Sequence, residues 1–174
     1  MKISVSKLQE QDPAIFSYDR SDIMLEVKKR SSYIGKMRGD ENNPNFIDRM
    51  SLTDGESFLS DEMIEDAVEQ VYEWLQAFGR GVDTPYNLTS SNIEFNLQPR
   101  PWWDRRSFGR VERYIKEALI NYVLYRWFEF TNAAESPAFF AKYEDYAHKA
   151  QLGMNASDGT LERRCNTPFN TIYG

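Results

Sequence analysis

Cysteine and histidine are almost missing from this sequence, with Cys165 and His148 as the single residues of each type. One cysteine excludes an internal disulfide framework and a zinc site built from several cysteines. A catalytic dyad or a metal site would need a nucleophile or further ligands beside His148. We interpret His148, in the polar stretch YEDYAHKA, as a surface residue, and Cys165 as a spectator thiol.

Long apolar runs and phosphate-binding loops are also missing. No apolar run reaches the roughly 18 residues that a transmembrane helix requires. The N-terminal MKISVSKLQEQ lacks the apolar core of a secretory signal peptide. GRG at 79–81 has neither the lysine nor the following serine or threonine of a P-loop. We therefore predict a protein that is not an enzyme, with no metal, no cofactor and no membrane segment.

What is present is enough for one folded domain. The chain has 174 residues, of which 41% are hydrophobic and 28% are charged, so it can bury a core and keep a polar surface. The net charge of −6 argues against broad, non-specific binding to nucleic acid.

Hydrophobic periodicity and capping signals predict a mainly helical chain. Short strands are expected near residues 2–8 and 92–98, where apolar and polar residues alternate, and Asp12-Pro13 ends the first. The expected helices cover 21–38, 53–78, 107–130, and a stretch that begins at Ser136-Pro137 and ends before Gly153. Their predicted starts are Ser21, a Thr53–Glu56 capping box and Ser136. We expect a helical domain over 1–152 and an extended tail over 153–174.

The segment ALINYVLYRWFEF, residues 118–130, is apolar around most of a helix. Its polar residues Asn121, Arg126 and Glu129 share an arc of roughly 140°. This helix is either central in the domain or buried by its own domain on one side and a partner on the other. In both interpretations Leu119, Val123 and Trp127 pack inside, and in the second Leu124 and Phe128 belong to an interface.

Positive charge gathers in PRPWWDRRSFGRVER, residues 99–113, around the start of the third predicted helix. The helix dipole favours negative charge there, so local stability does not explain the arrangement. An acidic partner surface or phosphate explains it, as does a basic turn that pairs with the acidic second helix. Tryptophan beside arginine is typical of an interface hot spot. The candidate interface residues here are Arg100, Trp102, Trp103, Arg105, Arg106 and Arg110.

The C-terminal LERRCNTPFNTIYG has no helical period but contains large apolar residues. Such ends are often disordered, yet a proline lowers the entropy cost of binding in a groove. We predict that residues 163–174 dock on a neighbouring subunit. The expected contacts are Arg163, Arg164, Phe169, Ile172 and Tyr173, with Phe169 as the anchor.

Several strings resemble the small head-to-tail connector proteins of tailed phages and prophages of Bacteroidetes bacteria. The first is KKRSSYIGKMRGDENNPNFIDRMSLTDGESFL, with Arg30, Ser31, Ser32, Tyr33 and Gly35 in the pattern R-[ST]-[SA]-Y-x-G. The strand and turn IEFNLQPRPWWDR, the long helix VERYIKEALINYVLYRWFEFT and a tail with the pattern RR-x-x-x-P-F follow in the family's order. The resemblance covers about residues 25–170. The pair of glycines in QLGMNASDGT departs from the family, which commonly continues helically into its tail.

The resemblance implies a four-helix, adaptor-like domain with a small β element. It implies a structural virion protein of the phage neck, made in the host cytoplasm, in a homo-oligomeric ring of roughly twelve copies. Such a ring binds the portal protein and the next neck or tail component, and DNA passes through its channel without specific binding. The alternative is a phage helical factor outside the virion that regulates or binds one protein.

Overall fold

The computed structural model describes residues 12–38, 51–52 and 57–156. These residues form four α-helices and a small antiparallel sheet, which confirms the mainly helical prediction. In chain order the elements are β1 (Ala14–Asp19), α1 (Arg20–Arg38), α3 (Ser57–Leu75), the 3-10 turn η2 (Gln76–Phe78), β2 (Tyr86–Leu88), β3 (Asn92–Leu97), η3 (Arg105–Ser107), α4 (Phe108–Thr131) and α5 (Ser136–Met154).

The sheet has the order β1-β3-β2, with both neighbours antiparallel to β3. β3 confirms the strand predicted over 92–98, and it buries Ile93, Phe95 and Leu97. The sequence prediction missed β1 and β2. Pro13 lies immediately before β1, so within the described residues it precedes a strand and does not end one. The segment 2–8 lies outside the described residues.

The helix boundaries follow the sequence closely, but two capping assignments are wrong. Asp19, not Ser21, caps α1, because its carboxylate accepts hydrogen bonds from the Ser21 N–H and hydroxyl, each at 2.7 Å. Ser136 does not cap α5, since its hydroxyl donates instead to the Tyr125 carbonyl. The capping box predicted at 53–56 lies outside the described residues.

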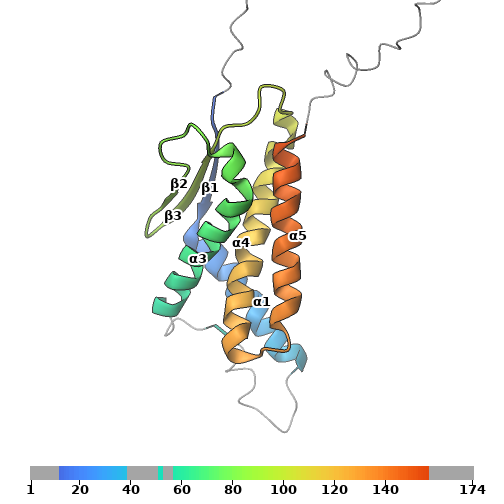
Figure 1. Cartoon of the computed structure of the whole chain (residues 1–174). Helices are drawn as coiled ribbons and strands as arrows, with labels where there is room; N and C mark the ends of the chain where they lie inside the picture. The colour runs from blue at the N-terminus through green and yellow to red at the C-terminus, as the bar shows by residue number, and fades with distance from the viewer. Residues whose placement is uncertain (1–11, 39–50, 53–56, 157–174) are drawn as a thin grey trace, which may run out of the picture.

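Helix α4 is the centre of the bundle, as Figure 1 shows, with α5, α3 and α1 around it. The predicted core residues Leu119, Val123 and Trp127 are buried. Leu124 and Phe128, which the sequence analysis placed in an interface, are also 0% exposed within the single chain. Of the two interpretations of 118–130, the central helix is therefore correct, and the assignment of Leu124 and Phe128 to an interface is wrong.

Gly153 lies inside α5 and does not mark the start of the tail. A Cβ built on Gly153 would lie 2.5 Å from Cγ2 of Val111, so glycine allows α5 to approach α4 closely. The helix continues to Met154, which corrects the predicted boundary at 152. Beyond it, the Ala156 carbonyl accepts a hydrogen bond from the Asp104 N–H at 3.0 Å.

The bundle thus has two distinct ends. At one end the segment 98–107 meets the end of α5, and at the other α4 turns into α5 beside the end of α1 (Figure 1). None of the described helices combines the length and apolar content that a membrane-spanning helix needs.

Candidate functional site

The arginine-rich segment that precedes α4 divides into a buried anchor and an exposed surface. Asp104 caps η3 by accepting the Arg106 N–H at 3.0 Å. Trp103 is buried, and its indole N–H donates to the Gly153 carbonyl at 2.8 Å. Trp103 therefore attaches this segment to α5, and the prediction that it contacts a partner is wrong.

The remaining predicted residues of this segment are exposed together. The Arg100 guanidinium carbon lies 5.7 Å from the centre of the Trp102 ring, and Trp102 is exposed. Arg105, Arg106 and Arg110 are exposed as well. We call Arg100, Trp102, Arg105, Arg106 and Arg110 the arginine surface.

No arginine of this surface forms an ion pair with another described residue. Among the described residues, the Arg110 guanidinium donates to the Ser107 hydroxyl alone, at 3.0 Å. On α3, Asp61 pairs with Arg20 at 2.7 Å and Asp66 pairs with Arg126 at 3.4 Å. The interpretation of a basic turn paired with the acidic second helix is therefore wrong for the described residues, and the positive charge is free to meet an anion.

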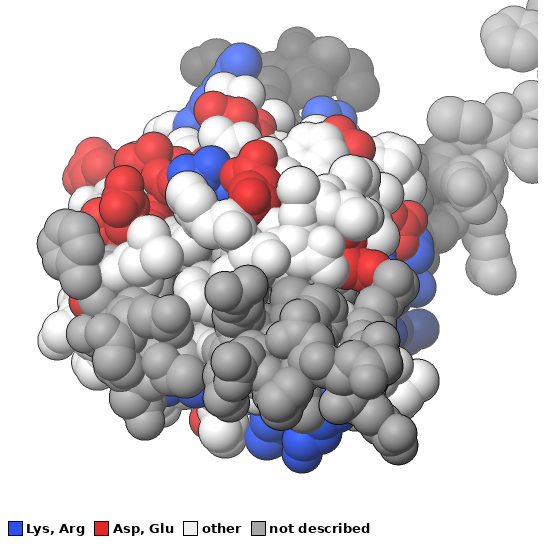
Figure 2. Space-filling view, turned by 90° about the horizontal axis from the view of Figure 1, so that it is seen from below, with Lys and Arg blue, Asp and Glu red and all other residues white. Residues whose placement is uncertain are grey.

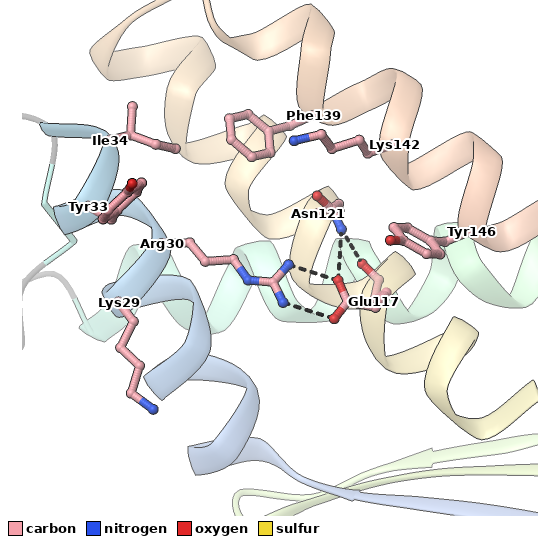
Figure 3. A pocket seen from close by; sticks show the side chains of 9 residues that line it. All are labelled: Lys29, Arg30, Tyr33, Ile34, Glu117, Asn121, Phe139, Lys142 and Tyr146. Carbon is pink, nitrogen blue, oxygen red and sulfur yellow. Dashed lines mark hydrogen bonds and ion pairs between the residues drawn. The ribbon is translucent and has the colours of Figure 1, made fainter. Parts of the chain in front are cut away.

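A groove between α1, α4 and α5 lies toward the other end of the bundle. Its volume is about 600 Å³, a size typical of ligand pockets. Figure 3 shows its walls, with Tyr33 and Ile34 on α1 and Phe139, Lys142 and Tyr146 on α5. The Lys142 ammonium lies 4.9 Å from the centre of the Phe139 ring. The walls are therefore mainly apolar and aromatic, with a cation at the rim.

The floor of the groove is a polar cluster. Both terminal nitrogens of Arg30 donate to the two carboxylate oxygens of Glu117 at 2.8 Å (Figure 3). Asn121 donates to the Glu117 backbone carbonyl at 2.7 Å and to its carboxylate at 3.4 Å. The hydrogen bond from Arg30 lowers the pKa of Glu117, and the same bond raises the pKa of Arg30. The cluster stays ionised and joins α1 to α4.

Large exposed apolar side chains lie on the three helices that form this groove, and none of them was predicted from the sequence to belong to an interface. Tyr33 and Met37 on α1 are 63% and 69% exposed, and Phe130 at the end of α4 is 65% exposed. Phe140 on α5 is also exposed. Seen from this end, much of the described surface is uncharged, with acidic side chains gathered over α3 (Figure 2). We call Tyr33, Met37, Phe130 and Phe140 the apolar surface.

The other predicted site residues add no chemical centre within the described part of the chain. Residues 163–174, with Arg163, Arg164, Phe169, Ile172 and Tyr173, lie outside the described residues, as does Cys165. His148 is exposed on α5, and its ring lies 6.0 Å from that of Trp74. Across 12–38, 51–52 and 57–156, no group of three histidine, cysteine, aspartate or glutamate side chains is placed to hold a metal ion.

The chain matches no protein-family model, no curated protein and no solved structure. The two surfaces are therefore the basis of the proposed function.

Proposed function

We propose that the chain is a structural adaptor of a tailed-phage neck, which forms a ring beneath the portal and joins the capsid to the tail. In this role it binds copies of itself, the portal protein and the next neck or tail component. It is a virion protein made in the host cytoplasm, and DNA passes along its channel. The resemblance in the sequence suggests this role, and the arrangement of the two surfaces supports it.

The observation that carries the proposal is that one rigid bundle exposes two chemically different surfaces at opposite ends. The arginine surface lies before the start of α4, and Phe130 of the apolar surface lies at its end. A helix of this length spans about 36 Å. An adaptor must bind two different partners at once, and surfaces that differ this strongly select different partners.

The arginine surface is the end that we assign to an acidic partner component. Its guanidinium groups are exposed and have no carboxylate partner among the described residues, so they are available for bidentate hydrogen bonds with carboxylates. Trp102 adds a large ring at the same place. Arginine and tryptophan together are the residue types that dominate binding energy at protein interfaces.

The apolar surface and its groove are the end that we assign to a neighbour that inserts large side chains. Exposed apolar side chains such as Tyr33, Met37 and Phe130 gain free energy when a partner removes them from water. The Arg30–Glu117 cluster joins α1 to α4 at the floor of the groove, and the groove is already formed within the single chain. A preformed groove lowers the entropy cost of binding.

The C-terminal segment belongs to the proposal through the place where the described chain ends. Ala156 lies beside Asp104, next to the arginine surface. We propose that residues 163–174 bind a neighbouring subunit from there, with Phe169 as the anchor. A chain truncated after Glu162 should keep its helical circular dichroism and fail to assemble. Normal assembly of the truncated chain would contradict this part of the proposal alone.

Two measurements test the adaptor role. The first is the mass of the purified protein in solution, together with its presence in purified particles by mass spectrometry. The second is the yield of tailed particles from phage that carry Arg105→Glu and Arg106→Glu. We expect a ring-sized species, a virion-resident protein, and untailed capsids from the double variant.

A matched control carries Arg80→Glu and Lys149→Glu, which make the same charge change at exposed positions elsewhere. This control should give tailed particles at the wild-type yield. Normal yields from the arginine-surface variant would exclude that surface as the joining contact. A monomer that is absent from particles would reject the adaptor and favour a phage interaction factor outside the virion.

A further inference from the structure

The floor of the groove between α1, α4 and α5 contains a hydrogen-bond acceptor that no described residue uses. Asn121 is only 2% exposed, and its amide nitrogen donates to the Glu117 backbone carbonyl and carboxylate. Both of these partners are acceptors, so the nitrogen must face Glu117. The Oδ1 oxygen of Asn121 therefore lies on the opposite side, toward Phe139 and Lys142 (Figure 3). Among the described residues, no group donates a hydrogen bond to this oxygen.

The unused oxygen opens on the groove. In the described part of the chain, Arg126 Nε is the only fully enclosed side-chain nitrogen or oxygen without a partner. Asn121 Oδ1 also lacks a partner, so it is not fully enclosed, and Asn121 lines the groove. A ligand that fills the groove must supply a hydrogen-bond donor at this point, because covering the oxygen without a donor loses its hydration. A single polar group in a mainly apolar site fixes the orientation of what binds there.

The walls beside this acceptor fit an aromatic ring that carries a donor at its far end. Phe139, Tyr33 and Tyr146 contribute three rings to the lining, and aromatic rings pack well against one another. A tyrosine that enters from the rim places its hydroxyl at the floor, since the O–H group lies at the end of the ring. An indole carries its N–H on the side of the ring system, and phenylalanine has no donor. Tyrosine therefore satisfies both the walls and the floor.

The lining is positively charged, although the whole chain has a net charge of −6. It contains three cations and one carboxylate, which are Lys29, Arg30, Lys142 and Glu117. Arg30 is bound to Glu117 at the floor, and Lys29 pairs with Glu26 at 2.9 Å. Lys142 is exposed and forms no ion pair with a described residue. Lys142 is therefore the cation that can bind a carboxylate of an incoming partner.

We propose that the groove binds a tyrosine side chain of a partner protein, in a segment that carries a carboxylate next to that tyrosine. The tyrosine hydroxyl donates to Asn121 Oδ1, and the carboxylate pairs with Lys142. The inference rests on the proposed function in one respect, because it identifies the large side chain that a neighbour inserts at this end of the bundle. A chain segment suits the site better than a small molecule does, since Tyr33 is 63% exposed and leaves the groove open along α1.

NMR titration of the full-length protein with the peptide acetyl-Glu-Tyr-Glu-amide tests the proposal. The backbone amide signals of residues 29–34, 117–121 and 139–146 should shift as the peptide is added. The same peptide with phenylalanine in place of tyrosine should bind about fivefold more weakly, because it covers the acceptor without a donor. A peptide with tryptophan at that position should also bind more weakly than the tyrosine peptide.

The variant Asn121→Ala assigns the contact at the floor. It should abolish the preference for the tyrosine peptide over the phenylalanine peptide, because the acceptor is gone. If Asn121 only supports the fold, the variant weakens both peptides equally and the preference stays. Circular dichroism shows whether this variant folds. If it does not fold, the comparison of the two peptides on the wild type still tests the donor.

The variant Lys142→Gln assigns the contact at the rim. It should weaken binding of acetyl-Glu-Tyr-Glu-amide about threefold, as expected for an exposed ion pair. It should leave binding of acetyl-Gln-Tyr-Gln-amide unchanged, because that peptide has no carboxylate. Lys149→Gln is the matched control, since Lys149 is exposed on the same helix and does not line the groove. That control should bind both peptides as the wild type does.

Four results would overturn the proposal. The first is a titration in which the groove amides do not shift. The second is equal or tighter binding of the phenylalanine or tryptophan peptide by the wild type. The third is a preference for tyrosine that survives in folded Asn121→Ala. The fourth is a shift of the groove amides when the protein alone is diluted, because a second copy would then occupy the groove.

These results are independent of the measurements that test the adaptor role. The peptides are added to purified protein, so binding requires neither a ring nor a particle. A monomer that is absent from particles would reject the adaptor and leave the tyrosine site standing. Conversely, a ring-forming virion protein that binds no tyrosine peptide would reject this inference alone.

Discussion

The start and the middle of α4 look alike in the sequence as interface candidates, but the structure gives them opposite environments. Arg105, Arg106 and Arg110 are exposed and have no ion-pair partner among the described residues. Leu124 and Phe128 are fully enclosed by the chain itself. The neighbours of an apolar helix in a small bundle are therefore sufficient to explain its composition, whereas unpaired charge on the surface is not explained by the fold.

A charge placed in the middle of α4 should have the largest effect on stability. Leu124→Asp buries an unpaired carboxylate, and we expect it to lower the free energy of unfolding by about 4 kcal/mol. Urea unfolding followed by circular dichroism measures the loss. Phe130→Asp on the same helix is the control, because Phe130 is exposed, and it should change stability by about 0.5 kcal/mol or less. Equal midpoints for Leu124→Asp and the wild type would contradict the central position of α4.

The next effect concerns the close approach of α5 to α4. Gly153→Ala brings a Cβ to 2.5 Å from the Val111 side chain, so we expect a loss of about 1–3 kcal/mol. Gly109→Ala is the matched control, since a Cβ there meets nothing within 4 Å. That control should be neutral or more stable by about 0.5–1 kcal/mol, as alanine favours helix. If both variants behave alike, Gly153 is not required by packing.

A pH-dependent effect tests the cluster under the groove. Glu117→Gln removes the charge that Arg30 binds and should cost about 1–3 kcal/mol at pH 7. Folding lowers the pKa of Glu117, so the stability that this group contributes is present above its ordinary value of 4.5 and is lost as the pH falls through the lowered value. The difference in the free energy of unfolding between wild type and variant should therefore shrink below about pH 4.5. Urea midpoints across this range measure it.

Glu144→Gln, at an exposed carboxylate of α5, is the control for that pH dependence. Its stability should follow the wild type within about 0.5 kcal/mol at each pH. A constant gap between Glu117→Gln and the wild type down to pH 3 would show that the ion pair is not the source of the stability.

Charge reversal on the arginine surface should have the smallest effect on stability. Arg105→Glu with Arg106→Glu should leave the free energy of unfolding within about 0.5 kcal/mol of the wild type. Both side chains are exposed, and negative charge near the start of α4 suits the helix dipole. The same urea measurement checks this. A large loss of stability would show that these arginines stabilise the fold. Their lack of an ion-pair partner would then be no evidence that they bind another protein.

Local patterns were sufficient for the helices and for β3. Helical spacing of apolar residues placed α3, α4 and α5 within a few residues, because one face of each helix must leave water. Strict alternation in NIEFNL identified β3. The strand β1 was missed although AIFSYD alternates equally well: its burial pattern depends on pairing with β3, which lies far along the chain.

Which residues make up the candidate surfaces could be predicted far less well than the helices, because surface exposure depends on tertiary structure. Trp102 and Trp103 are adjacent in sequence, yet Trp103 is buried against α5 and Trp102 is exposed, a difference that no local pattern carries. Nor does local sequence bring Arg30 to Glu117, or Tyr33 near Phe139. These residues meet because α1 and α5 pack against the same central helix.

Two properties can be predicted without any tertiary contact: a mainly helical chain with a small β element, and a concentration of arginine before α4. These properties follow from side-chain chemistry and from periods of a few residues. Tertiary structure alone decided which apolar residues the chain covers for itself and which it leaves exposed. Burial depends on the contacts among α1, α3, α4, α5 and the sheet, and those contacts join residues that are distant in sequence.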